Sequence, residues 1–149
     1  MGIKENLERD LLIALKQKDD VRKQTIRMIL SSLKLLQVEK GQPVQDPDVL
    51  NVLQKELKIR QEAIDDAIKA NRQDLVDANL MEINVIKAYL PEQLSMDEIK
   101  SLASQVINEV GALGMNDMGK VMKAILPKIQ GRASNAMVNQ AIREILSQG

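Results

Sequence analysis

The chain contains no cysteine, histidine, phenylalanine or tryptophan, and Tyr89 is its only aromatic residue. Without cysteine it can form no disulfide and offers no thiolate nucleophile, and without histidine it lacks the commonest general base and metal ligand. Catalysis by carboxylates or lysines remains open, although paired acids such as Asp65 and Asp66 are typical of a solvated helix surface. We therefore expect no catalytic residue, no metal site and no cofactor, and we favour a role other than that of an enzyme.

Long apolar runs are also missing. No stretch approaches the roughly 20 consecutive apolar residues that a membrane-spanning helix needs. The first residues, MGIKENLERDLL, mix charged and apolar side chains at helical spacing and do not resemble a signal peptide. The expected location is therefore the cytoplasm, with no membrane partner.

The composition that remains favours helices. Hydrophobic residues make up 44% of the 149 residues and charged residues 28%, whereas there are only seven glycines and four prolines. Ala, Leu, Lys, Gln, Glu and Met, which dominate the sequence, are strong helix formers. The sequence therefore predicts an all-α protein with a core of aliphatic side chains and methionine.

Apolar residues recur at helical spacing in four stretches before Pro91. Asp19 or Asp20 can cap the second stretch, and Pro47 suits the first turn of the third. The polar side of the second stretch carries four basic residues, which is typical of a solvated face neutralised by neighbouring helices. The four predicted helices cover residues 3–15, 21–40, 47–70 and 75–90.

A boundary follows the fourth stretch. Pro91 disfavours helical geometry at Leu90 and cannot donate a backbone hydrogen bond. Four residues later, Ser95 and Glu98 have the spacing of a capping box, which marks the start of a new helix. We therefore predict an N-terminal four-helix subdomain over residues 1–93 and a C-terminal three-helix subdomain over residues 94–149.

The stretch DMGKVMKAILPKIQGR is the most distinctive part of the C-terminal subdomain. Its Gly131 suits a left-handed helix C-cap, and Ser134 can cap the last helix. Between Gly114 and Arg143 there are five basic residues against Asp117 alone. A basic patch beside a helix N-terminus can hold phosphate groups, because the free amides and the helix dipole also favour anions. The alternative is that Gly119 merely allows another helix to approach and that the lysines only increase solubility. The candidate phosphate-binding residues are Gly119, Lys120, Lys123, Lys128, Gly131 and Arg132.

Four motifs resemble the GatB/YqeY family: NRQDLVD, EINVIKAYLPEQLSMDEI, EVGA and DMGKVMKAILPKIQGRA. This helical module stands alone in YqeY-like proteins and also forms the tail of the B subunit of tRNA-dependent amidotransferases. The resemblance covers nearly the whole chain. It implies an N-terminal four-helix unit followed by a small three-helix unit, with the small unit contacting tRNA.

Carried over to this sequence, the tRNA contacts implied by the resemblance fall on Gly119, Lys120, Lys123 and the run from Gly131 to Ala133. One departure is Ser134-Asn135, where family members often have Asp-Gly, so this chain has no glycine at position 135 for a backbone contact. The catalytic portion of the amidotransferase has no counterpart in these 149 residues.

The favoured interpretation is a tRNA-binding accessory module that recognises backbone phosphates and the shape of the folded RNA. Two other interpretations stay open. The chain could be a helical protein–protein interaction module that docks on a translation enzyme, such as an aminoacyl-tRNA synthetase or an amidotransferase. It could also be a non-catalytic component that assists glutamine-dependent amidation of tRNA, a carbon–nitrogen ligase reaction.

Overall fold

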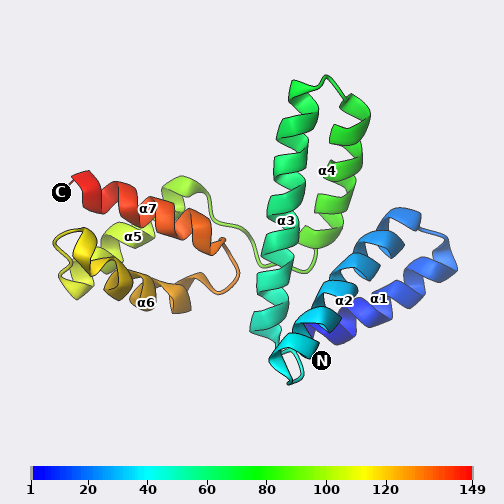
Figure 1. The fold of residues 1–149 in the computed structure, drawn as a ribbon, viewed down its shortest axis with the longest axis horizontal. Coiled ribbons are helices and arrows are strands. Elements are labelled where there is room, and N and C mark those ends of the chain that lie inside the picture. The colour runs from blue at the N-terminus through cyan, green and yellow to red at the C-terminus, as the bar shows by residue number, and fades with distance from the viewer. Residues whose placement is uncertain (1, 149) are drawn as a thin grey trace. The chain divides into compact units, whose positions relative to one another are not determined.

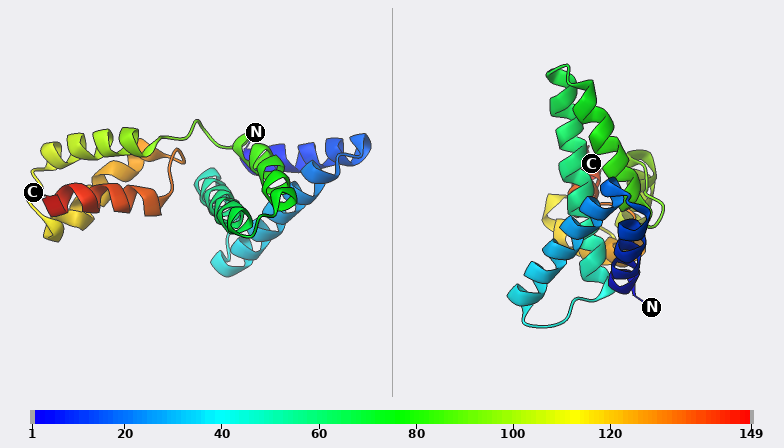
Figure 2. Two further views of the ribbon diagram at one scale, coloured as in Figure 1. Left: turned by 90° about the horizontal axis from the view of Figure 1, so that it is seen from above. Right: turned by 90° about the vertical axis from the view of Figure 1, so that its right-hand side faces the viewer.

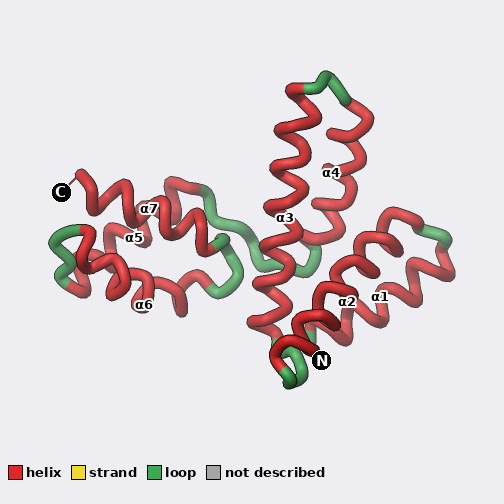
Figure 3. Tube along the Cα trace, viewed as in Figure 1, coloured by secondary structure: helices red, strands yellow, loops and turns green. Residues whose placement is uncertain are grey.

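A computed structural model describes residues 2–148, and over this range the chain is built from seven α-helices and one short 3-10 helix (Figures 1 and 3). The all-α prediction is confirmed. The helices are α1 (Ile3–Gln17), α2 (Asp20–Lys40), α3 (Asp46–Lys69), α4 (Gln73–Lys87), α5 (Met96–Val110), η1 (Met115–Asp117), α6 (Met118–Ile129) and α7 (Asn135–Gln148).

The chain divides into two compact units, Met1–Pro91 and Glu92–Gly149. The boundary between the units follows Pro91, two residues before the boundary predicted after residue 93. Each unit has its own buried aliphatic cluster, and no residue belongs to both. No helix within residues 2–148 is long and apolar enough to cross a membrane.

The first unit consists of two helical hairpins. α1 packs against α2, α3 packs against α4, and α2 also contacts α3 and α4. Figure 2 shows α3 and α4 side by side from two further directions. The core of this unit is formed by Leu7, Ile26, Ile29, Leu33, Val49, Leu53, Leu57, Ile83, Ile86 and Leu90.

Local sequence explains where the helices of this unit begin and end. Asp19 caps α2, since its carboxylate accepts a hydrogen bond from the Arg22 amide at 3.2 Å. Gly41 ends the same helix in the left-handed conformation, with a φ of 68°. Pro47 lies in the first turn of α3 as predicted. Asn71, with a φ of 56°, forms part of the tight turn into α4.

The second unit is a three-helix bundle in which α5, α6 and α7 contact one another pairwise. The predicted capping box begins α5. The Ser95 hydroxyl accepts from the Glu98 amide at 3.2 Å, and the Glu98 carboxylate accepts from the Ser95 amide at 3.0 Å. Ser134 caps α7 by accepting from the Met137 amide at 3.2 Å, also as predicted. The buried cluster of this unit includes Ile99, Val106, Val121, Ile125, Val138 and Ile142.

The end of α6 differs from the prediction. The sequence suggested that Gly131 would be the left-handed C-cap, but Gln130 takes that position with a φ of 42°, and Gly131 follows with a φ of 81°. Two successive residues with positive φ turn the chain sharply toward α7. Pro127 lies inside α6, which continues as one helix to Ile129.

Candidate functional site

The N-terminus of α6 is preceded directly by the 3-10 turn η1. Asp117 occupies the N-cap position, but its carboxylate accepts from the Leu113 amide at 2.9 Å and makes no cap bond to α6. The amides of Asp117 and Met118 donate to carbonyls of the 3-10 turn. Because only the first four amides of a helix lack partners within it, at most the amides of Gly119 and Lys120 remain for a ligand. The anion site predicted at this helix end therefore has fewer free backbone amides than an uncapped helix N-terminus would offer.

Gly119 lies in the first turn of α6 and is exposed. A Cβ atom built on it would meet no heavy atom within 4 Å, and its φ lies outside the left-handed region. The expectation that Gly119 lets another helix of this chain approach is therefore wrong. Glycine in a helix costs about 0.5–1 kcal/mol relative to alanine. Nothing in the described fold requires that cost.

Lys120 and Lys123 extend the open surface beside Gly119. Both are exposed, and neither forms a salt bridge or hydrogen bond through its side chain with any residue between 2 and 148. Residues three and four apart are neighbours on a helix surface, so Lys123 lies beside both Gly119 and Lys120. We call these three residues the α6 surface. It places two unneutralised charges next to a position without a side chain.

The other three predicted residues have partners within their own unit. The Lys128 ammonium forms a salt bridge with Glu109 at 3.1 Å, and Arg132 donates from Nη2 to the Lys128 carbonyl at 2.8 Å. The Gly131 carbonyl accepts from the Gln93 amide group at 2.9 Å. These bonds fasten the turn after α6 to its own unit. Three of the six predicted residues therefore form the α6 surface, and the other three make contacts at the end of α6.

Arg132 also acts on a carboxylate of the capping box. The pKa of Glu98 lies below its ordinary value, chiefly because the Ser95 amide and hydroxyl hydrogen-bond to it, and the positive charge of Arg132 adds to this effect. Arg132 is partly buried, in contrast to the exposed Lys120 and Lys123. One nitrogen of its guanidinium is thus engaged within the unit.

The charge of the C-terminal unit as a whole is balanced, with six basic and six acidic residues between positions 92 and 149. Lys100 pairs with Glu144 at 2.8 Å, as Lys128 does with Glu109. The positive character is therefore local to the α6 surface and to Arg143 on α7, which is exposed and has no salt-bridge partner between residues 2 and 148. Over the same range, no group of three or more carboxylates is arranged to hold a metal ion.

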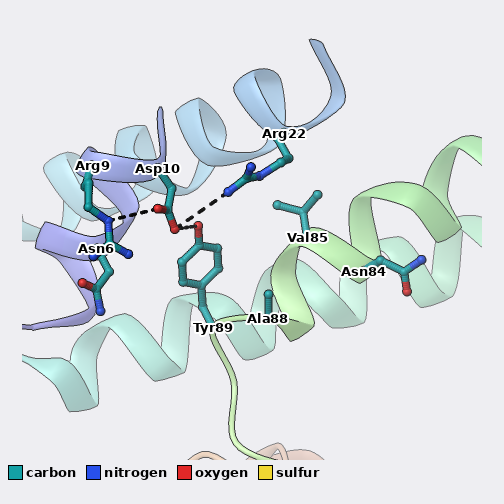
Figure 4. Close-up of a pocket in the computed structure, with 8 residues that line it drawn as sticks. All are labelled: Asn6, Arg9, Asp10, Arg22, Asn84, Val85, Ala88 and Tyr89. Atoms are coloured by element: carbon teal, nitrogen blue, oxygen red, sulfur yellow. Dashed lines mark hydrogen bonds and ion pairs between the residues drawn. The ribbon is translucent and has the colours of Figure 1, made fainter. Parts of the chain in front are cut away.

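A pocket of about 490 Å³ in the N-terminal unit was not expected from the sequence. It lies between α1, α2 and the end of α4, and Figure 4 shows Asp10 at its centre. The Tyr89 hydroxyl donates to the Asp10 carboxylate at 2.5 Å. Arg9 Nε lies 3.2 Å from one carboxylate oxygen, and Arg22 Nη2 lies 4.0 Å from the other. Two cations and a phenol therefore surround one carboxylate.

The electrostatics of this pocket hold Asp10 ionised and Tyr89 protonated. Burial by itself raises the pKa of Asp10, but the hydrogen bond from Tyr89 and the charges of Arg9 and Arg22 outweigh it, so the pKa lies below its ordinary value. Burial, followed by the hydrogen bond to the Asp10 carboxylate, raises the pKa of Tyr89 to about 12. The only sequence signal for this site was that Tyr89 is the single aromatic residue, within YLPEQLS. No spacing rule links it to a carboxylate 79 positions away.

Comparison with known proteins decides the family. A family model described as Yqey-like protein matches residues 4–146. The chain belongs to this family. The resemblance predicted from the motifs is confirmed for the YqeY-like part, over almost the whole sequence.

Several fungal proteins are similar to this YqeY-like chain, among them proteins named Altered inheritance of mitochondria protein 41, mitochondrial. The protein from Lachancea thermotolerans is 31% identical over 130 residues, which is 87% of this chain and 69% of the relative. The one from Vanderwaltozyma polyspora is 30% identical over 144 residues, 91% and 77% of the two chains. The one from Clavispora lusitaniae is 32% identical over 124 residues, 80% and 72% of the two chains. A mitochondrial location belongs to those names, and a cytoplasmic location for this chain stays a prediction.

Proposed function

We propose that this YqeY-like protein is an RNA-binding accessory module that holds tRNA through the α6 surface. Two observations at this surface carry the proposal. Gly119 is exposed although no contact within the described fold requires a glycine there, and the two lysines beside it are exposed and unpaired. A position without a side chain lets a phosphate approach the helix backbone closely. The two ammonium groups then neutralise its charge.

The chemistry of this surface suits phosphates and folded RNA better than single-stranded bases. The C-terminal unit contains no aromatic residue, so it offers no ring on which a base could stack. Lysine is a strongly hydrated point charge that attracts phosphate without selecting a base. We therefore expect weak, sequence-tolerant binding to the backbone and shape of tRNA.

Salt dependence tests this mechanism. Each neutralised phosphate contributes about −0.7 to −0.9 to the slope of log affinity against log salt concentration. Two lysines, with or without Arg143, therefore predict a shallow slope of about −1.4 to −2.7 for a tRNA titration. Changing Lys120 and Lys123 together to Gln should reduce the slope by about two.

A matched control is Lys55→Gln combined with Lys34→Gln. Both residues are exposed lysines of the N-terminal unit, so this variant loses the same net charge without touching α6. Its affinity for tRNA should stay close to that of the unaltered protein. Equal losses in the two double variants would show that only overall charge matters. Either that result or a lack of tRNA binding at low salt would overturn the proposal.

A second candidate function, docking on another protein, is favoured by one face of α2. Leu35 is 61% exposed and Val38 is 73% exposed, on the side of the helix opposite the buried Ile26, Ile29 and Leu33. Arg27 and Lys34, both exposed and without a salt bridge among residues 2–148, flank this face. Charge complementarity favours as occupant an amphipathic helix with acidic residues beside its apolar stripe.

Co-elution with a purified tRNA-dependent amidotransferase or aminoacyl-tRNA synthetase tests this candidate. We expect the variant with Leu35→Glu and Val38→Glu to lose co-elution, because two acidic groups would oppose an acidic partner helix. The variant altered at Lys120 and Lys123 should retain it. Co-elution that survives the changes on α2 would rule this face out.

A further inference from the structure

The Asp10 carboxylate in this pocket is already engaged by a phenol and two cations. The carboxylate accepts from the Tyr89 hydroxyl and from Arg9, and it faces Arg22 as well (Figure 4). Each of its oxygens therefore already has a donor or a cation beside it. A ligand that seeks a carboxylate, such as an amine or a metal ion, would have to displace these partners.

Hydrogen-bond donors, in contrast, remain available. A guanidinium has five N–H groups, and each arginine is seen to direct only one nitrogen at Asp10. The Arg9 side chain is 57% exposed and that of Arg22 is 34% exposed, so their other N–H groups can reach a ligand. The side-chain amides of Asn6 and Asn84 also line the pocket. Two arginines against one carboxylate leave the lining with a net positive charge.

The remaining lining is apolar. Val85 and Ala88 come from the end of α4, and the ring of Tyr89 stands between them and Asp10 in Figure 4. The volume of about 490 Å³ falls within the roughly 300–1,000 Å³ of small-molecule sites. The pocket thus combines a cationic side with an aliphatic and aromatic side, at a size suited to a small organic anion.

We propose that this pocket binds a phosphate ester, with Arg9 and Arg22 on the phosphate and the organic portion against Val85, Ala88 and the ring of Tyr89. Arginine is suited to phosphate because its planar fork donates two parallel hydrogen bonds to an oxyanion. Asp10 orients both guanidinium groups, since it accepts a hydrogen bond from Arg9 Nε and forms an ion pair with Arg22 Nη2 at 4.0 Å. This site is separate from the α6 surface and does not rest on the proposed function.

The composition of the chain makes the site directly observable. With one tyrosine and no phenylalanine, tryptophan or histidine, the aromatic proton NMR spectrum in D2O contains only the ring signals of Tyr89. We expect adenosine 5′-monophosphate to shift these signals in a saturable way. Its own base signals lie elsewhere in the spectrum. Inorganic phosphate and adenosine should each bind at least about tenfold more weakly, since each supplies only half of the contacts.

Single-residue variants test whether the nucleotide binds in this pocket. Arg9→Gln and Arg22→Gln should each weaken the binding of adenosine 5′-monophosphate about tenfold, the loss expected for a charge-assisted hydrogen bond. Arg9 is well exposed, so its replacement leaves the fold intact, which circular dichroism can verify. The matched control is Arg27→Gln, an exposed arginine of α2 that does not line the pocket. It should bind as the unaltered protein does.

A dinucleotide distinguishes a free nucleotide from a segment of RNA as the source of the phosphate. Adenylyl-adenosine carries only an internal phosphodiester, so a saturable shift of Tyr89 with both probes identifies RNA as a possible source. A shift with the monophosphate alone identifies a small metabolite. The proposal is overturned if neither probe shifts Tyr89, if the two arginine variants bind unchanged, or if inorganic phosphate binds as tightly as the nucleotide.

Discussion

Arg60 on α3 and Glu82 on α4 form a salt bridge of 3.3 Å although 22 residues separate them in the sequence. The arginine is only 3% exposed. It also pairs with Glu56 on its own helix at 2.7 Å and donates to the sulfur of Met28 on α2 at 3.6 Å. One buried guanidinium thus connects three helices of the N-terminal unit.

Replacing Arg60 with Met should destabilise this unit by about 3 kcal/mol, because removing one partner leaves the two glutamates near the interior without a counter-charge. Urea unfolding followed by tyrosine fluorescence measures the effect, since Tyr89 reports on the N-terminal unit alone. The matched control is Lys58→Met, which breaks the exposed pair with Glu62 on the same helix and should cost less than about 1 kcal/mol. Equal losses would contradict a special role for Arg60.

The salt bridges of Arg60 show which contacts can be predicted from the sequence and which cannot. Glu56 and Arg60 are four apart on one helix, so their pair follows from spacing alone, whereas Glu82 joins it only because α3 and α4 form a hairpin. The capping box at Ser95 was predicted for the same reason, since its bonds join residues three apart. The contact of Asp10 with Tyr89 depends on how the tertiary fold brings α1 and the turn after α4 together, and no local rule contains that information.

In the candidate phosphate site, too, contacts between distant residues could not be predicted from the sequence. Sequence and family resemblance together placed six residues in one phosphate site, but they could not separate Lys120, which has no salt-bridge partner between residues 2 and 148, from Lys128, which pairs with Glu109. The partner of Lys128 lies 19 positions away on α5. Likewise, the open space beside Gly119 could not be told from a close helix contact before the bundle was known.

The titration of Tyr89 gives a second prediction. Its pKa is about 12 in the folded protein against an ordinary value of 10, so the folded state holds the proton more tightly. The contribution to stability is complete below pH 10 and is lost as the pH rises from 10 to 12. Tyrosinate absorbance should therefore titrate near pH 12 in the folded protein and near pH 10 in urea.

The Asp10→Asn variant is the control for this titration. Burial of Tyr89 is retained, but the charge and the acceptor that oppose ionisation are weakened, so the pKa should fall part of the way toward 10. A titration near pH 10 in the unaltered folded protein would contradict the hydrogen bond between the two side chains.

A third prediction concerns the two separate cores. Ile125 is fully buried in the cluster of the C-terminal unit, and its replacement by Ala should cost about 2–5 kcal/mol. A unit this small has little stability in reserve, so it should unfold first on heating. The loss should be seen in circular dichroism at a temperature where the fluorescence of Tyr89 in the other unit is unchanged. A single transition seen by both probes would show that the units unfold together.

The last prediction compares two glycines that differ only in backbone conformation. At both Gly119 and Gly111 an added Cβ atom would meet nothing within 4 Å, but Gly111 has a φ of 69° and Gly119 lies outside the left-handed region. Gly119→Ala should therefore stabilise the C-terminal unit by up to about 0.5–1 kcal/mol, whereas Gly111→Ala should destabilise it by about 1–2 kcal/mol.

The Gly119→Ala and Gly111→Ala variants also distinguish an effect on protein stability from an effect on tRNA binding. If a phosphate approaches the backbone at Gly119, the more stable Gly119→Ala protein should bind tRNA more weakly, because the new methyl group occupies the place of approach. The less stable Gly111→Ala protein should keep its affinity at a temperature where it is folded. Thermal unfolding and a tRNA titration on both variants give the comparison. Undiminished tRNA binding by Gly119→Ala would remove Gly119 from the site and leave a surface that acts through its lysines alone.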